Sequence, residues 1–422
     1  MALPGARHGA FVRMFGSAIV VQALLSATNF IVGLILIRRT TNVDYGYYVL
    51  VTATALLVTG LQNAYIQPPL VIRMTPATRE QRAELIGGIW RGQRRILAIV
   101  AGLAALLVVL LGASGMVTTD LALLGLSSVF ALSAALFRDF FRTVLLSYRR
   151  STDVLKADVC YGGLLLLLVP LATLTPLPAM AAVAGVGVAA VAGGILLARA
   201  LWLHEPWNRA GPMRMLRELA PLGTWSALGS ATHWSFSQGY NYVVAGTLDV
   251  AAVAALAATR LLMMPVNLLS GGIGSLMMAT ATSWLHAHGS RELFRRLLLI
   301  ACGLGALASI YFFAIWWLRD LIFWRLMHKQ FAQSGLMVAA WSAVFLVMIF
   351  RDQLNFVPGA SGLHRRLMGV TAAAAVVSLV AGYVAIRQLG ALGAPLGVLL
   401  GELCNLAGII CLSVLEMRRR RD

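Results

Sequence analysis

The chain has 422 residues, of which 59% are hydrophobic and 12% are charged, and its formal net charge is +18. Soluble domains carry roughly 25% charged residues, so this composition excludes an ordinary soluble globular protein. The cations lie in short loops between apolar runs, which argues against a nucleic-acid partner, and little chain remains for a soluble enzymatic domain, so no enzymatic activity is expected.

Twelve apolar runs are long enough to cross roughly 30 Å of hydrocarbon, and they predict an all-α polytopic membrane protein. In chain order they cover residues 16–37, 45–67, 96–116, 121–145, 154–174, 179–201, 219–246, 250–277, 297–318, 336–357, 367–386 and 395–415. The first run is longer than a signal-peptide core and is interpreted as a retained helix. Two six-helix lobes are predicted, residues 1–205 and 206–422, around a central cavity.

The loops predict the orientation of these helices. One side of the predicted membrane carries 24 Lys and Arg residues and the other side carries 6. Because cytoplasmic loops are enriched in cations, the first side is predicted to be cytoplasmic. Both termini then lie in the cytoplasm of a bacterial inner-membrane protein.

Short motifs recur at about half the chain length. Phe137-Arg138-Asp139 in the fourth run matches Phe350-Arg351-Asp352 in the tenth, and each is followed by a double arginine. The loop Thr41–Asp44 resembles Thr247–Asp249. Repeated halves are common in transporters, so the sequence predicts two parallel halves related by an axis along the membrane normal.

No cofactor or metal is predicted. Cys160, Cys302, Cys404 and Cys411 lie in or beside apolar runs without metal-ligand spacing. No phosphate-binding loop or nucleophile elbow is present.

Arg260 is the sharpest functional candidate, because it lies well inside the eighth run, where a charge costs at least about 2.5–3.5 kcal/mol. Asn267 follows seven residues later and is expected on the same helix face. Two interpretations are open: Arg260 binds an anion in a transport pathway, or it forms a structural ion pair with Asp352 or Glu402.

Three further arginines lie near the cytoplasmic ends of predicted spans. Arg138 and Arg142 lie one turn apart in the fourth span, and Arg351 lies similarly in the tenth. They either line the inner mouth of a cavity or extend toward the lipid headgroups. Adjacent helix positions point about 100° apart, so Asp139 and Asp352 need not pair with the neighbouring arginine.

The seventh run is unusually polar for a lipid-facing helix. Trp234, Gln238 and Asn241 share one helical spacing, and His233 lies near the predicted midplane. These side chains are expected to line water or a substrate path, although a buried, hydrogen-bonded role for His233 stays open. The first run carries a thinner polar stripe that includes Gln22 and Asn29.

The segment from Asn29-Phe30 to Ile37-Arg38, followed by Asp44-Tyr45-Gly46-Tyr47-Tyr48, resembles the polysaccharide-transporter (Wzx-like) branch of the multidrug/oligosaccharidyl-lipid/polysaccharide (MOP) exporter superfamily. The resemblance implies a flippase that moves undecaprenyl-diphosphate-linked oligosaccharide to the periplasmic leaflet by alternating access. Its expected partners are this substrate, membrane lipids and the polysaccharide polymerase or export machinery. The basic residues would then hold diphosphate and sugar.

The substrate-binding candidates are therefore Arg260, Arg138, Arg142, Arg351, His233, Trp234, Gln238, Asn241, Asn267, Asn29 and Gln22, and the candidates for energy coupling are His233, Asp352 and Glu402. Three other functions stay open. A multidrug exporter should place carboxylates in the cavity. A membrane-embedded polymerase or glycosyltransferase needs larger outer loops. A non-transporting scaffold requires neither cavity carboxylates nor large loops.

Overall fold

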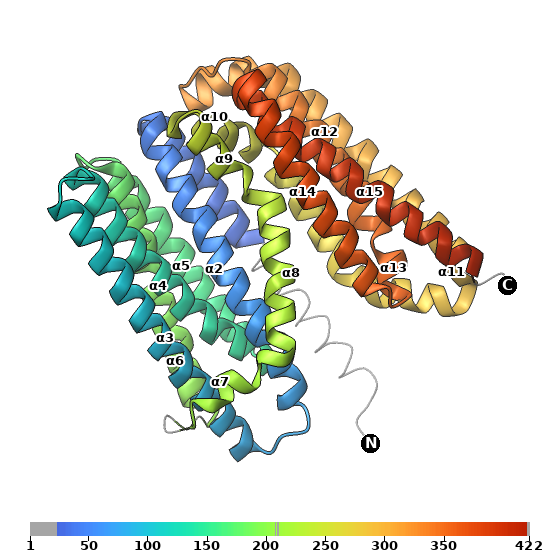
Figure 1. The fold of residues 1–422 in the computed structure, drawn as a ribbon, viewed down its shortest axis with the longest axis horizontal. Helices are drawn as coiled ribbons and strands as arrows, with labels where there is room; N and C mark the ends of the chain where they lie inside the picture. The colour runs from blue at the N-terminus through green and yellow to red at the C-terminus, as the bar shows by residue number, and fades with distance from the viewer. Residues whose placement is uncertain (1–22, 207, 209–210, 420–422) are drawn as a thin grey trace. The chain divides into compact units, whose positions relative to one another are not determined.

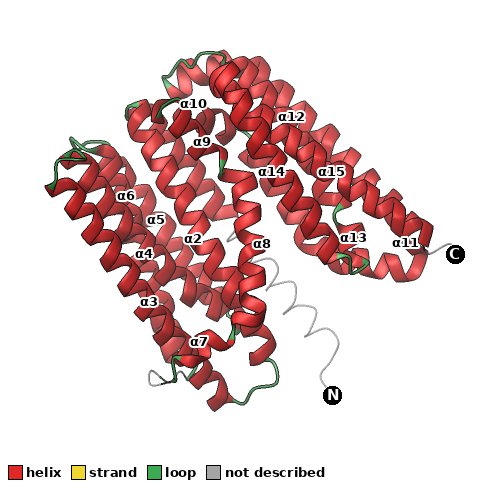
Figure 2. Ribbon diagram, in the orientation of Figure 1, coloured by secondary structure: helices red, strands yellow, loops and turns green. Residues whose placement is uncertain are grey.

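The computed structural model describes residues 23–206, 208 and 211–419. Every regular element in these residues is a helix (Figure 2). Residues 23–39 are helical, and the earlier part of the first predicted span lies outside the described residues. Eight helical segments in the described part are long and apolar enough to span a membrane. The prediction of an all-α polytopic membrane protein is therefore confirmed.

The chain forms two compact units, Met1–Thr40 with Leu50–Ala231, and Thr41–Val49 with Thr232–Asp422. We call them unit 1 and unit 2. Their boundary lies within a helix, downstream of the lobe boundary predicted at residue 205, so the lobes 1–205 and 206–422 stay a prediction.

Long helices connected by short turns build unit 1 (Figure 1). They are α2 (Asn42–Met74, whose first residues belong to unit 2), α3 (Arg79–Ala113), α4 (Thr119–Ser147), α5 (Ser151–Ala172), α6 (Pro178–His204), the short α7 (Arg214–Glu218) and α8 (Ala220–Gln238), which continues into unit 2. Helix α6 packs against both α4 and α5.

Unit 2 contains both short and long helices. In order they are α9 (Tyr240–Thr247), α10 (Val250–Leu261), α11 (Met264–Leu321), a π-helical turn η1 (Ile322–Met327), α12 (Ser334–Leu354), α13 (Phe356–Ala360), α14 (His364–Leu389), a 3-10 turn η2 (Gly390–Leu392) and α15 (Gly393–Arg419). Gly289 has a φ of 80° inside α11 and divides it into two helices across a kink. These two helices correspond to parts of the eighth span and the ninth span.

Three predicted spans differ from the observed helices. The third was predicted to begin at Ile96, but α3 begins at Arg79. Its charged first half is amphipathic, and Leu85, Ile86 and Ile89 are buried in the core of unit 1. The seventh and eighth spans were predicted as continuous helices, and the structure breaks them at Gly239 and at Leu262–Met263.

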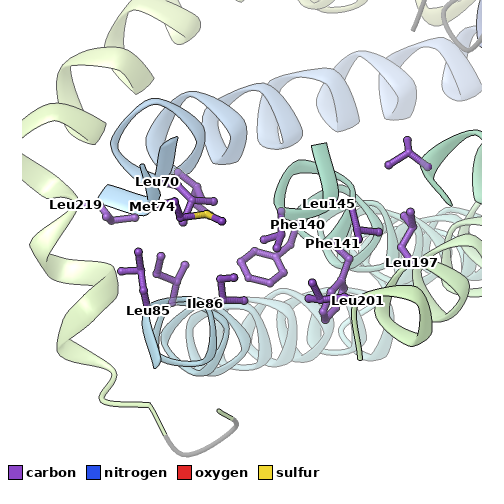
Figure 3. Packing of buried hydrophobic residues seen from close by; sticks show 14 of the residues in the cluster. Leu70, Met74, Leu85, Ile86, Phe140, Phe141, Leu145, Leu197, Leu201 and Leu219 are labelled. Carbon is purple, nitrogen blue, oxygen red and sulfur yellow. The ribbon is translucent and has the colours of Figure 1, made fainter. Parts of the chain in front are cut away.

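The core of unit 1 fills the space between the ends of α2, α3, α4 and α6 (Figure 3). Phe140 and Phe141 lie at its centre, and the Trp90 ring lies 5.1 and 4.9 Å from their centroids. Leu145 and Leu201 close the cluster on the side of α6. Close-packed aromatic rings of this kind hold neighbouring helices in fixed register.

The second half of α3 has the opposite character. Ile96, Ile99, Leu103, Leu106 and Leu110 are each more than half exposed. A soluble protein would not present such a stripe to water. Exposed apolar residues along a helix this long indicate contact with lipid.

The connections at residues 114–118 and 173–177 are predicted to lie in the periplasm. In a background whose four native cysteines are replaced, G115C and P176C should react with a membrane-impermeant thiol reagent in intact cells. T75C lies in the loop before α3, which is predicted to be cytoplasmic, and should react only after the membrane is opened. Reaction of T75C in intact cells, or protection of the other two, would contradict the predicted orientation.

Candidate functional site

Arg260 lies in the last turn of α10, one residue before the helix ends at Leu261. The chain turns at Leu262 and Met263, and α11 begins at Met264 with Pro265 in its first turn. Proline has no backbone N–H and favours the start of a helix over its interior. Arg260 therefore occupies the C-terminal end of a short helix, where the partial negative charge of the carbonyl groups favours a cation.

The start of α10 is fixed by a side-chain cap and by a close backbone contact. The Asp249 carboxylate accepts a hydrogen bond from the Ala252 N–H at 2.6 Å. A Cβ atom on Gly46, near the start of α2, would lie 2.1 Å from the Val250 carbonyl oxygen, so only glycine fits there. The Thr41 hydroxyl, in turn, accepts from the Asp44 N–H at 3.1 Å, so both of the similar loop motifs cap helices.

Neutral groups hold the Arg260 guanidinium. Its Nη1 donates to the Ser237 carbonyl at 3.1 Å, to Gln238 Oε1 at 3.1 Å and to the Tyr240 hydroxyl at 2.8 Å. The guanidinium carbon also lies 5.6 Å from the Tyr240 ring centroid and 5.5 Å from that of Trp341. Each such cation–π contact contributes about 0.5–2 kcal/mol, more when it is desolvated.

The carboxylates proposed as ion-pair partners of Arg260 pair with Arg351 instead. Arg351 Nη1 lies 3.0 Å from Glu402 Oε1, and its Nη2 lies 2.7 Å from Asp352 Oδ1. Among the described residues, no carboxylate forms an ion pair with Arg260. The structure therefore does not support an Arg260 ion pair with Asp352 or Glu402, and it shows that Asp352 does pair with the arginine adjacent to it in sequence.

These groups nevertheless form one electrostatic cluster in unit 2. Glu402 lies within electrostatic range of Arg260 as well as Arg351, and His233 lies within range of Arg351 and Asp352. Arg351 and Glu402 are 8% and 2% exposed. We refer to Arg260, Arg351, Asp352, Glu402 and His233 as the unit 2 charge cluster.

The polar residues predicted on one seventh helix lie on both sides of the break at Gly239. Trp234 and Gln238 belong to α8, and Asn241 belongs to α9. Asn241 is buried and donates from Nδ2 to Gln238 Oε1 at 3.1 Å. The Trp234 ring lies 5.6 Å from the Tyr242 ring. Gln238 therefore links Asn241 to Arg260.

The remaining polar candidates of the first and eighth spans are only partly described. Asn29 is exposed on the helix of residues 23–39, whereas Gln22 lies outside the described residues. Asn267 is part of α11, but its side chain is outside what the structure describes. The interruption at Leu262–Met263 lies between Arg260 and Asn267, and the expectation that the two side chains share a helix face stays a prediction.

Arg138 and Arg142 lie in unit 1 and share one carboxylate. Arg138 Nη2 contacts Asp158 Oδ1, and Arg142 Nε lies 3.1 Å from Asp158 Oδ2. The Asp158 side chain is fully buried, and the Arg138 guanidinium stacks 3.8 Å from the Tyr161 ring centroid. The two arginines are therefore held by an ion pair from α5 that was not predicted from the sequence.

The repeated Phe-Arg-Asp motif has the same local role in each unit. Arg138 lies in the second half of α4 and pairs with Asp158 of α5, and Arg351 lies in the last turn of α12 and pairs with Glu402 of α15. In both cases an arginine late in one helix binds a buried carboxylate of another helix in the same unit.

Tyr311 is a site residue that the sequence did not indicate. Its hydroxyl donates to the Leu262 carbonyl at 2.8 Å. Val266 N–H bonds to Met263 rather than to Leu262, so the break before Pro265 leaves that carbonyl without its usual helical donor. Tyr311 therefore stabilises the broken helix that positions Arg260. Pro265 marks the break in the sequence, but no local pattern indicates that a residue 49 positions away completes it.

No protein-family model matches the sequence, and no curated protein matches it. Solved structures do match. A multidrug resistance MATE family transporter of the MOP superfamily, in an inward-facing conformation, is 14% identical over 94% of each chain, with a TM-score of 0.72. The lipid II flippase MurJ, in an inward closed conformation, is 8% identical over 93% of this chain and 86% of that one, with a TM-score of 0.74.

A eukaryotic MATE transporter, AtDTX14, is 12% identical over 98% of each chain, with a TM-score of 0.66. At these identities the likeness shows the fold alone. The chain has the fold of MATE transporters and of MurJ, and the predicted twelve-helix, two-lobe arrangement is consistent with that fold.

The different environments of Arg351 and Arg260 predict different costs of substitution. Arg351→Gln removes the charged partner of buried Glu402 and should lower the free energy of unfolding by about 3–5 kcal/mol. Arg260→Gln loses bonds to neutral groups and should cost about 1–3 kcal/mol. Thermal unfolding of the detergent-solubilised protein measures the difference.

Arg296→Gln is the matched control, because Arg296 pairs with Glu292 at 2.9 Å on a partly exposed helix face. Such pairs contribute about 0–1 kcal/mol. Equal loss of stability in the Arg351 and Arg296 variants would contradict the buried role of the Arg351 pair.

Proposed function

We propose that this chain is a flippase that moves undecaprenyl-diphosphate-linked oligosaccharide from the cytoplasmic to the periplasmic leaflet of the bacterial inner membrane. The translocated oligosaccharide would be used in cell-surface or exopolysaccharide synthesis, and the polysaccharide polymerase and export machinery would be its partners. Lobes 1–205 and 206–422 would alternate access to the substrate, with both termini in the cytoplasm. The fold shared with MurJ and with MATE transporters supports a transporter of this kind.

The observation that carries the proposal is the environment of Arg260. Its guanidinium is held by a carbonyl, an amide oxygen and a hydroxyl, and all three bonds use Nη1. Among the described residues no acceptor is bonded to its Nε or Nη2. Two N–H groups of a guanidinium form a planar fork that matches phosphate oxygens. A diphosphate can therefore bind without displacing the groups that orient Arg260.

The neighbouring polar groups supply the expected sugar contacts. Trp234 offers an aromatic face, and Gln238 and Asn241 offer amide groups one and two residues from the break at Gly239. Asn29, Gln22 and Asn267 stay proposed contributors on the first and eighth spans. Arg138, Arg142 and Arg351 are proposed as secondary anion contacts, and each would have to exchange part of its present ion pair for the substrate.

The unit 2 charge cluster suggests how an ion gradient would act on the substrate. The formal charges of Arg260, Arg351, Asp352 and Glu402 cancel. A proton taken up by Glu402 or His233 would leave one excess positive charge, which strengthens the attraction for a diphosphate. Glu402 is suited to this role because its Oε2 is buried and has no hydrogen-bond partner among the described residues. We therefore propose proton coupling through Glu402 and His233, with Asp352 as the fixed counter-charge.

A multidrug exporter is the main alternative, because MATE transporters share the fold. Export of organic cations calls for a carboxylate available to the substrate. In the described residues of unit 2, both Asp352 and Glu402 already bind Arg351, so the arrangement favours an anionic substrate. A membrane-embedded polymerase or glycosyltransferase is the second alternative, and the sidedness experiment below separates it from a flippase.

Removal of the Arg260 charge should abolish most transport. Loss of a charge-assisted hydrogen bond costs about 1.5–3 kcal/mol, so Arg260→Gln should lower glycan translocation by about tenfold or more, and Arg260→Lys should retain part of it. The measurement is lipid-linked oligosaccharide in a deletion strain that carries each variant, with sidedness read by a glycan probe confined to the periplasm. Arg296→Gln serves as the control for expression and charge.

In the deletion strain, lipid-linked oligosaccharide is expected to accumulate on the cytoplasmic face alone. Accumulation on the periplasmic face would show that translocation is intact and would move the assignment to a later polymerisation or export step. Resistance to cationic drugs that depends on the chain, with normal glycan export in its absence, would favour the multidrug exporter.

The coupling proposal predicts a specific pH dependence. Protonation removes negative charge beside Arg260, so the affinity for geranylgeranyl diphosphate should rise as the pH falls, and E402Q should weaken that dependence. The ratio of wild-type to variant affinity at each pH cancels the titration of the ligand itself. If E402Q and H233A both retain the full dependence shown by the wild-type protein, the coupling role of these residues is wrong.

A further inference from the structure

The end of α11 and the π-helical turn η1 carry a continuous apolar stripe. Ile310, Phe313, Trp317, Leu321 and Trp324 follow one another at intervals of three or four residues, and each is 55–70% exposed. This spacing keeps the side chains on one face. The stripe runs from aliphatic and phenyl groups at one end to tryptophan at the other.

The tryptophans indicate where this stripe leaves the hydrocarbon. Trp side chains concentrate at the membrane–water interface, because the indole ring is amphipathic. Trp316, Trp317 and Trp324 lie within the last turns of α11 and in η1. The helix ends directly after them at His328, which has a left-handed backbone with a φ of 51°. The tryptophans therefore predict that this end of α11 lies at the level of the lipid headgroups.

Cations lie among the same tryptophans. The Arg319 guanidinium stacks 4.5 Å from the Trp316 ring centroid, and the Arg325 guanidinium stacks 5.1 Å from that of Trp324. Lys329 follows η1. The only acid from Ile310 to Gln333 is Asp320, which is exposed and lies 3.6 Å from Arg319. The segment therefore carries a net excess of positive charge at the interface.

This concentration of charge is unusual for its side of the membrane. The side predicted to be periplasmic has 6 Lys and Arg residues in the predicted topology, and three of them are Arg319, Arg325 and Lys329. Cations outside the cytoplasmic loops oppose the positive-inside preference. Their presence in one short segment calls for a local binding role.

We infer that the end of α11 and η1 form a binding site for the headgroups of anionic phospholipids. The headgroup phosphate binds Arg319, Arg325 and Lys329, and the acyl chains cover the stripe from Trp324 to Ile310. Stacking on Trp316 and Trp324 limits the freedom of the two guanidinium groups before the lipid arrives. The site does not depend on the proposed flippase activity.

A glycan is the alternative occupant, because sugars stack on exposed tryptophan. The observations favour lipid, since the stripe continues through Leu321, Phe313 and Ile310 toward the hydrocarbon, where a glycan would lose its hydration. The arginines also supply donors that match phosphate better than hydroxyl groups.

The test compares lipid retention by two charge-matched triple variants of the full chain. The first is R319Q/R325Q/K329Q, and the control is R38Q/R39Q/R387Q, which removes the same charge from the other cations of the same side. Each protein is reconstituted in nanodiscs of phosphatidylglycerol and phosphatidylcholine, extracted, and examined by native mass spectrometry. Retained phosphatidylglycerol should fall by about tenfold or more in the first variant and stay near the wild-type level in the control.

An equal fall in both variants would show general charge attraction and overturn the site, as would no fall in either. W317A/W324A tests the stripe without changing the charge, and it should also lower retention of phosphatidylglycerol. Retention that is unchanged in W317A/W324A, together with lost binding of a soluble oligosaccharide, would assign the surface to a glycan instead.

Discussion

A guanidinium group surrounded by apolar helices must be compensated, and the described part of this chain does so in two ways. Arg138, Arg142 and Arg351 bind buried carboxylates of other helices. Arg260 is compensated by neutral dipoles, two aromatic faces and the end of a helix. The first arrangement makes these arginines less available to other anions, because an incoming anion must displace part of an existing ion pair. The second leaves the charge available, and this difference singles out Arg260.

The broken eighth helix follows from the same constraint. A continuous helix would bond the carbonyl groups of its last turns internally and leave none to face a cation. Helix α10 ends at Leu261, which places Arg260 at the C-terminal end of a helix, and α11 begins at Met264 with Pro265 in its first turn. The break frees the Leu262 carbonyl, which in an apolar setting costs about 1–3 kcal/mol if it stays unbonded. Tyr311 supplies the missing donor from the second part of α11.

Hydropathy and charge predicted the helices well, because each span needs a local run of apolar residues and nothing from elsewhere in the chain. Arg260 was singled out as a candidate for a related reason, since a charged residue within an apolar run can be recognised from the local sequence alone. The ion-pair partners of the arginines could not be recognised from the sequence. Asp158 was not singled out, and Glu402 was considered as a partner of Arg260 but binds Arg351. Pairing depends on which faces of distant helices meet, and periodicity within one helix carries no such information.

The start of α3 at Arg79 was missed because its buried, amphipathic half is too charged to resemble a membrane span.

The repeat shows how similar halves can serve different purposes. Each Phe-Arg-Asp motif places an arginine in the second half of one helix, where it binds a buried carboxylate of another helix. This ion pair holds the two helices together within each unit. Unit 2 then adds Arg260 close to such a pair, and Glu402 lies within range of both arginines. Glu402 binds Arg351, and no carboxylate of the described residues binds Arg260, but a change in the charge of Glu402 would alter the electrostatic potential at Arg260. In the proposed coupling, the pair that stabilises the unit would also regulate the affinity of the neighbouring cation, which a pair with no third group nearby could not do.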